Sequence, residues 1–501
     1  MYTKEGIYLG LAGEQRLILP LNMANRHGLI AGASGTGKTV TMKVMAEDFS
    51  AAGVPVFLCD IKGDVSGLCE PGASSEGMEK RIDRFMIRDE FSYRSFPVCF
   101  WDVYQQRGRS VRATVSDMGP ELLGRVLGLS EVQTGVLNIL FRIADESGLE
   151  LIDLKDLRAM LEHITENRAE LSAKYGNMSA QSISSIFRAL IPLENQGGEL
   201  FFGEPALDIH DWIRRDANGH GYINLLRCER LAQSPVLYAT FMLWLMSELF
   251  EVLPEVGDMD KPKLVFFFDE AHMLFTDAPR TLVQKIEQMV KLIRSKGVGV
   301  YFVTQSPSDI PDPVLAQLSH RVQHALRAYT PAEQKAVRAA VQSMRANPDF
   351  DAAKVMLELG VGQALVSLLG PDGVPGIVQR TAIICPQSKM APAEEQYEAA
   401  ARASDGMEKY DNYVDNESAF EKLARQKDID AERQALEAER AQLEKEKAEL
   451  EAKKQKEEAK AAAAAEKASQ RRRAQIERQL INTGAQVLKR GLLGTLLGKR
   501  R

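Results

Sequence analysis

The sequence has few features of an exported or membrane-spanning protein. Its five cysteines are scattered singly, with no CxxC pair, which argues against a disulfide framework or a cysteine zinc site. The first twenty residues lack the basic start, apolar core and small-residue cleavage site of a signal peptide. The most apolar helical stretch, Phe241 to Leu253, contains two glutamates and is shorter than the roughly 20 apolar residues that a bilayer requires. We therefore expect a cytoplasmic protein with no transmembrane segment.

The chain also lacks a strong overall charge, because the formal net charge of its 501 residues is −6 at pH 7. This charge is unevenly distributed: residues 471–501 hold nine Lys or Arg and one acid. Since 45% of the residues are hydrophobic, the rest of the chain can bury a sizeable core. The composition predicts a globular protein that ends in a basic tail.

Short apolar runs alternate with helical patterns through most of the chain. The first unit consists of a strand at 27–32, a helix from about residue 38 and a strand at 54–60. Further apolar runs, suited to strands buried on both faces of a parallel sheet, lie at 96–104, 222–226, 264–270, 298–305 and 320–328. Two last runs, at 362–368 and 376–384, are predicted to form a closing hairpin. The pattern predicts an α/β fold with a mainly parallel sheet.

Two regions depart from this alternation. Residues 120–193 have a helical pattern and no strand signal, so we expect a helical insertion within a domain that spans 1–392. From 393 to 470 the composition shifts to Ala, Glu, Lys, Arg and Gln, which is typical of a long solvated helix. Apolar residues recur there every seven positions, at Ile429, Leu436, Leu443 and Leu450. The second seam position is usually charged, so a single charged helix and a weak coiled coil are both open.

A complete phosphate-binding loop, GASGTGKT, occupies Gly32 to Thr39, between a predicted strand and a predicted helix. Its glycines let successive backbone N–H groups face the phosphates, and the helix that follows adds the positive end of its dipole. Lys38 is expected to reach the β- and γ-phosphates, and the Thr39 hydroxyl is expected to ligate Mg²⁺. The loop predicts that ATP and magnesium bind to Gly32, Ala33, Ser34, Gly35, Thr36, Gly37, Lys38, Thr39 and Val40.

The apolar run LVFFFDE, from Leu264 to Glu270, ends in two carboxylates. Open α/β sheets bind ligands at the carboxyl ends of their strands, which would place these acids beside the phosphate loop. We expect Asp269 in the magnesium shell and Glu270 as the group that orients or deprotonates the attacking water. An Asp–Glu pair after a strand can also cap a helix, but the phosphate loop upstream favours the catalytic role. Gln305 ends another predicted strand and is a candidate sensor of the γ-phosphate.

Five motifs together resemble one family. Besides GASGTGKT and FFFDEAH, the chain has CDIKGD at 59–64, IRSKGVGVYFVTQ at 293–305 and TQSPSDIPDPVLAQ at 304–317. Over roughly Gly28 to Ile384 the chain resembles the HerA/FtsK superfamily of P-loop motor ATPases, and most closely its HerA-helicase-like bacterial branch (YjgR-type). The resemblance implies a RecA-like core that assembles as a ring, usually hexameric, with ATP at subunit junctions and double-stranded DNA as the usual track.

The resemblance also implies roles for residues that composition alone would not single out. Arg294, three residues before Gly297, matches the arginine that acts on the γ-phosphate of a neighbouring subunit, and Arg327 is a second, weaker candidate. Asp60, with Lys62 beside it, matches an acid of the magnesium shell. Two departures bear on these expectations: residues 1–31 leave no room for the β-barrel that usually precedes a HerA core, and no winged-helix DNA reader is evident. DNA as the substrate therefore rests on analogy.

Two functions are open from the sequence. The first is ATP hydrolysis by an oligomeric HerA-like motor, a DNA translocase or helicase-like remodeller. The alternative is a nucleotide-dependent switch, with slow hydrolysis and no DNA track, whose C-terminal helix engages a partner protein. The basic tail at 471–501 is compatible with nucleic-acid binding, with an interfacial helix on a membrane surface and with a solubilising end.

Overall fold

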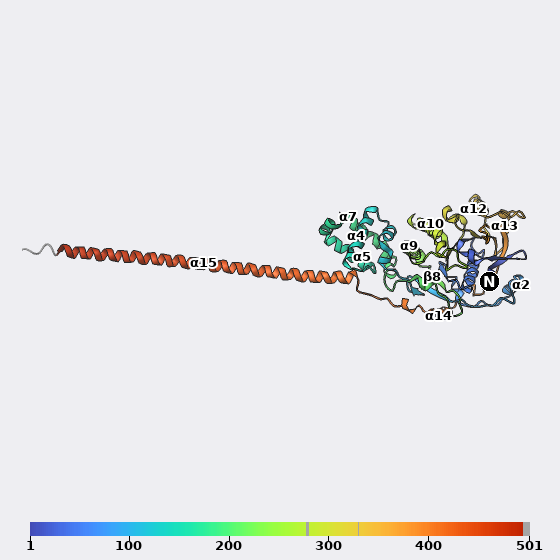
Figure 1. The fold of residues 1–501 in the computed structure, drawn as a ribbon, viewed down its shortest axis with the longest axis horizontal. Coiled ribbons are helices and arrows are strands. Elements are labelled where there is room, and N and C mark those ends of the chain that lie inside the picture. Colours follow the sequence, from blue (N-terminus) through green and yellow to red (C-terminus); the bar gives the residue numbers. More distant parts are fainter. Residues whose placement is uncertain (277–279, 329, 494–501) are drawn as a thin grey trace, which may run out of the picture. The chain divides into compact units, whose positions relative to one another are not determined.

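The computed structural model describes residues 1–276, 280–328 and 330–493 (Figure 1). The chain forms two units, Met1–Leu423 and Ala424–Arg501. The domain boundary expected at residue 392 falls inside the first unit. The end of the expected basic tail, residues 494–501, lies outside the described residues.

A 13-stranded sheet organises the first unit, in the order β1-β2-β13-β12-β11-β4-β10-β9-β5-β8-β6-β7, with β3 paired to β2. The run from β11 to β7 is parallel throughout. Its strands are β4 (Gly28–Ala31), β5 (Val56–Asp60), β6 (Val98–Asp102), β7 (Arg109–Ser110), β8 (Ile223–Arg227), β9 (Leu264–Phe268), β10 (Val298–Thr304) and β11 (His320–His324). Each predicted parallel strand is present, and the short β7 is an addition. The fold is α/β with a mainly parallel sheet, as the sequence predicted.

Both faces of the parallel strands are covered, which explains their continuous apolar runs. In β9, Phe266 and Phe268 face a core formed with helices α9 (Pro235–Val252) and α10 (Arg280–Leu292). Val265 and Phe267 face the opposite core, which contains residues of helix α1 (Lys38–Ala51). By length and composition α9 could cross a membrane, but 67% of its apolar window is buried inside the structure, as in the core helix of a globular domain. The five cysteines are free and buried.

The antiparallel part of the sheet closes one edge. The hairpin predicted near 362–384 is confirmed as β12 (Gln363–Ser367) and β13 (Gln379–Ile383). β13 pairs with an N-terminal group that the sequence did not predict, namely β1 (Tyr2–Thr3), β2 (Gly6–Ala12) and β3 (Gln15–Leu19). The second strand of the unit, β2, and its last strand, β13, are thus neighbours in the sheet.

Helices fill the region of the expected insertion, and no strand lies within 120–193. They are α3 (Val115–Val126), α4 (Glu131–Ser147), α5 (Leu154–Glu166), α6 (Arg168–Tyr175), α7 (Ala180–Asn195) and α8 (Gly198–Phe201). Capping boxes at Thr114, Ser130 and Asp153 begin three of them. The other helices of the unit are α2 (Glu76–Arg84), α11 (Asp312–Leu315), α12 (Pro331–Gln342), α13 (Ala352–Glu358) and α14 (Glu395–Ser404).

Residues 393–423, which follow the expected boundary, belong to the first unit and pack against its strands. The buried Arg109 guanidinium donates to the buried Asp405 carboxylate at 2.8 to 3.2 Å. The Tyr410 ring meets the Trp101 ring edge-on, with the centroids 5.2 Å apart. Residues 393–423 therefore complete the core of this unit, although their composition resembles that of the solvated helix.

Helix α15 (Ala419–Leu493) begins in the first unit and makes up the described part of the second (Figure 1). The apolar residues that recur along it every seven positions are about half exposed: Ile429 48%, Leu436 50%, Leu443 49% and Leu450 57%. A long C-terminal helix is thus present, and its pairing as a coiled coil stays a prediction.

Candidate nucleotide-binding site

The phosphate loop connects β4 to α1 at the carboxyl ends of the parallel strands. Gly32 and Gly37 have φ values of 154° and 114°, which side-chain-bearing residues rarely adopt. A Cβ atom on Gly32 would lie 2.5 Å from the Cβ of His324, so the loop can approach β11 only with glycine there. The Lys38 ammonium donates to the Ala33 carbonyl at 3.2 Å and so closes over the loop.

Residues at the end of β11 and at the start of β12 support the loop from outside the motif. The Ala33 N–H donates to the Ala325 carbonyl at 2.9 Å, and the Gly362 N–H donates to the Thr36 carbonyl at 3.0 Å. The buried His324 ring bonds the Thr41 hydroxyl of α1 at 2.8 Å, and burial lowers its pKa to about 4, so the ring is neutral. No motif in the sequence marked His324 as part of this site.

The two acids after β9 lie at the same carboxyl ends of the parallel strands as the phosphate loop. Glu270 adopts a left-handed conformation, with φ 45°. Its carboxylate forms a salt bridge with Lys62, contacts His272 Nδ1 at 3.2 Å and accepts from the Gln305 amide at 3.5 Å. The structure thus brings Glu270 and Gln305 together, as their expected roles require, and adds Lys62 as the direct partner of Glu270.

Charges in this group shift one another's protonation. Burial raises the pKa of Asp269 to about 7, although Lys62 partly opposes the shift. Burial also acts to raise the pKa of Glu270, but the contacts with Lys62 outweigh it and hold that pKa below its usual value. Burial lowers the pKa of Lys38, and the Glu270 carboxylate opposes this change. Glu270 is therefore ionised at neutral pH and able to accept a proton.

Asp269 is the residue best suited to hold a cation. Its side chain is only 2% exposed, and its Oδ2 makes no hydrogen bond within the described part of the chain. A buried carboxylate oxygen without a partner is costly unless a cation or water completes it. The described residues contain no cluster of three His, Cys, Asp or Glu side chains. A magnesium ion here would therefore take most of its ligands from phosphate, water and a hydroxyl, as Mg²⁺ usually does.

Asp60 lies at the end of β5 but is turned toward its own loop. Its two carboxylate oxygens accept the N–H groups of Gly63 at 2.7 Å and Val65 at 3.2 Å. Burial raises its pKa to about 6. Asp60 thus shapes the loop that carries Lys62, and its expected place in the magnesium shell stays a prediction.

The two arginines lie at opposite ends of the parallel strands. Arg294 precedes β10, whereas the phosphate loop follows the far end of β4, and the paired strands place Thr304 beside Ala31. The seven residues of β10 span about 20 Å. Arg294 is 39% exposed and pairs with Asp258 at 3.2 Å, so it cannot reach the loop of its own chain. Arg327 is exposed, three residues beyond the end of β11, at the edge that carries the loop.

The family described as "Helicase HerA-like C-terminal" matches residues 9–501. The chain belongs to this family. The HerA-like fold is also similar to that of the plasmid coupling protein TrwB in complex with ADP and Mg²⁺, with a TM-score of 0.53 and 15% identity over 78% of this chain and 91% of that one. TrwB in complex with the ATP analogue ADPNP gives a TM-score of 0.52 at 15% identity, over 78% and 93% of the two chains. No curated protein gives a significant match.

Proposed function

We propose that this HerA-like protein is an oligomeric motor ATPase that hydrolyses ATP with Mg²⁺ and acts on double-stranded DNA. The carrying observation is that three features meet at the carboxyl ends of the parallel strands: the phosphate loop, the Asp269 oxygen that has no hydrogen bond within the described residues, and the ionised Glu270. The similar fold of TrwB, whose structures contain ADP with Mg²⁺ and an ATP analogue, supports the choice of ligands.

The side chains divide the chemistry of hydrolysis between them. The Lys38 ammonium, which bonds Ala33 in this structure, exchanges that carbonyl for β- and γ-phosphate oxygens. Thr39 and Asp269 would hold the magnesium ion, which neutralises phosphate charge when bound. Glu270 accepts a proton from the attacking water, while Lys62 and Gln305 fix the orientation of its carboxylate.

The position of Arg294 supports a ring assembly. This arginine lies at the amino ends of the parallel strands, whereas its own phosphate loop lies at their carboxyl ends. It can therefore stabilise the γ-phosphate only in a neighbouring copy. We therefore infer a homo-oligomeric ring, hexameric as in related motors, in which each ATP is completed by the next subunit.

The test is ATP turnover with and without duplex DNA, measured alongside the native mass. A ring mass together with DNA-stimulated turnover in the range of about 1 to 1000 per second supports the motor. Slow turnover that is indifferent to DNA would favour the alternative, a nucleotide-dependent switch that engages a partner protein through α15. The Lys38→Ala variant, prepared in parallel, sets the background of contaminating ATPases.

A further inference from the structure

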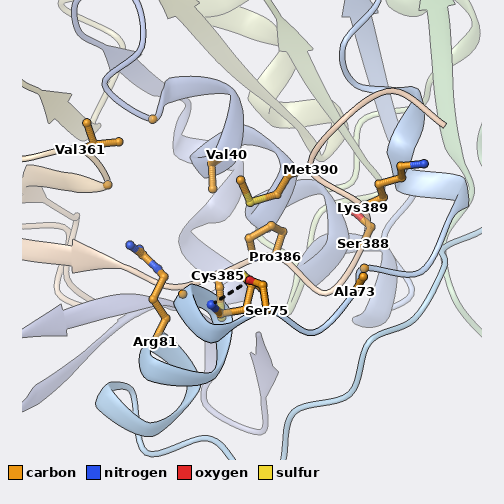
Figure 2. Close-up of a pocket in the computed structure, with 15 residues that line it drawn as sticks. Val40, Ala73, Ser75, Arg81, Val361, Cys385, Pro386, Ser388, Lys389 and Met390 are labelled. Atoms are coloured by element: carbon orange, nitrogen blue, oxygen red, sulfur yellow. Dashed lines mark hydrogen bonds between the residues drawn. The ribbon is translucent and has the colours of Figure 1, made fainter.

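A cavity of about 620 Å³ opens beside the phosphate loop (Figure 2). Gly37 and Val40 line it from the loop and the start of α1. Its other walls come from α2, which supplies Met78 and Arg81, and from the segment after β13, which supplies Pro386 and Met390. The volume is that of a pocket for a small organic molecule.

The cavity continues the phosphate site on the side away from the catalytic carboxylate. Its lining includes Gly37 of the loop but neither Glu270 nor Gln305, which the proposed function assigns to the γ-phosphate end. Gly362 also lines it, and the N–H of that residue bonds the loop at the Thr36 carbonyl. A nucleotide whose γ-phosphate lies near Glu270 therefore directs its other end into this cavity.

Arg81 provides a positive charge in the cavity wall. Its Nη2 donates to the Ile383 carbonyl at 2.6 Å, and it forms no salt bridge within the described residues. A Cβ atom on Gly362 would lie 3.1 Å from Nη2, so the guanidinium lies against the backbone that bonds the phosphate loop. A partly buried guanidinium without a carboxylate is suited to an anionic ligand, and phosphate is the anion that the loop supplies.

The opposite wall is apolar and is fixed to the same helix as the loop. Figure 2 shows Val40, Pro386 and Met390 gathered together in the cavity. Behind them, the Glu47 carboxylate of α1 accepts the N–H groups of Gln387 at 2.8 Å and Ser388 at 3.0 Å. Helix α1 therefore positions both the phosphate loop and this wall.

We propose that the cavity binds the nucleoside of the bound nucleotide, with the base against Val40, Pro386 and Met390 and with Arg81 on the α-phosphate. The apolar wall buries the flat faces of the base, and Arg81 replaces water at the phosphate nearest the ribose. This assignment rests on the proposed ATPase function and adds residues of α2 and of the segment after β13, which no motif marks.

Calorimetric binding of Mg–ATP and of inorganic Mg–triphosphate separates the nucleoside from the phosphates. Met390→Trp, which fills the cavity, should weaken ATP binding at least about tenfold and leave triphosphate binding unchanged. Arg81→Ala should weaken both ligands about 10- to 100-fold. Val132→Trp, at a 69% exposed position on α4, and Arg84→Ala, at an exposed position on α2, are matched controls and should bind like the wild type.

Three results would overturn the assignment. If the wild type binds ATP no more tightly than triphosphate, the nucleoside has no site and only the cavity assignment fails. If Met390→Trp binds ATP normally, or loses both ligands equally while its thermal unfolding is unchanged, the cavity does not hold the base. If the wild type binds neither ligand, the ATPase function fails along with the cavity assignment.

Discussion

The substitution Asp405→Asn tests how far residues 393–423 contribute to the stability of the first unit. It keeps the size of the side chain and removes the charge that faces Arg109. Both side chains are buried, at 0% and 3% exposure, and three donor–acceptor contacts of 2.8 to 3.2 Å join them. Asp411, which also pairs with Arg109, is 32% exposed and stays in place.

The expected cost is that of leaving a buried charge without its main partner. Removing one member of a buried ion pair typically costs about 3 to 5 kcal/mol, and the remaining Asp411 favours the lower end, about 3 kcal/mol. A unit of this size, Met1–Leu423, has an unfolding entropy of about 0.9 kcal/mol/K. The Tm should therefore fall by about 3 °C.

Thermal unfolding followed by circular dichroism measures this change on the full-length protein. Asp411→Asn, at the more exposed partner, should lower Tm by at most about 1 °C. In the double variant Arg109→Met with Asp405→Asn, no buried charge is left unpaired, so its Tm should lie closer to the wild type than that of Asp405→Asn. A Tm for Asp405→Asn equal to the wild type, or a double variant less stable than the single, would refute this reasoning.

Four further predictions concern the nucleotide site and the tail. Lys38→Ala should lose ATP binding, whereas Glu270→Gln should bind ATP and retain it unhydrolysed; near-normal phosphate release by either variant would contradict their roles. Arg294→Ala should assemble and bind ATP but hydrolyse little, and mixing it with Lys38→Ala should restore activity, so a mixture that exchanges subunits without recovery would argue against this arginine. Lys62→Met removes the charge that lowers the pKa of Glu270, so that pKa should rise and the acidic limb of the pH–rate profile should move to higher pH; an unmoved limb would exclude Glu270 as the titrating base. Truncation after Ser469 should weaken binding to duplex DNA most at low salt, and loss of binding to anionic vesicles alone would assign the tail to a membrane surface.

The parallel strands were predictable because burial on both faces leaves a direct trace in the sequence. The run Leu264 to Glu270 predicted a strand followed by two acids, and β9 ends at Phe268, immediately before them. The N-terminal strands left a weaker trace. β2 contains Gly6 and Gly10, and it joins the sheet only through β13, whose residue Thr381 pairs with Ala12. A pairing over such a sequence separation has no local signal.

The partners of the motif residues were the least predictable part of the site. The sequence indicates Lys62 only as a neighbour of Asp60, because its salt bridge with Glu270 depends on how two loops meet in space. The boundary expected at 392 reflected a change of composition. Polar composition indicates solvation on average, but it cannot show that Asp405 pairs with the buried guanidinium of Arg109.

The way α15 begins has a mechanical consequence. Its first turn is fastened to the helical insertion by one buried carboxylate, that of Asp156, which accepts the Ser418 hydroxyl at 2.5 Å and the Phe420 N–H at 2.9 Å. The same side chain accepts the Ile152 N–H at 2.8 Å, just before α5. A force applied to α15 would therefore reach the first unit by two routes: through these hydrogen bonds to α5, and through the covalent chain of residues 393–418.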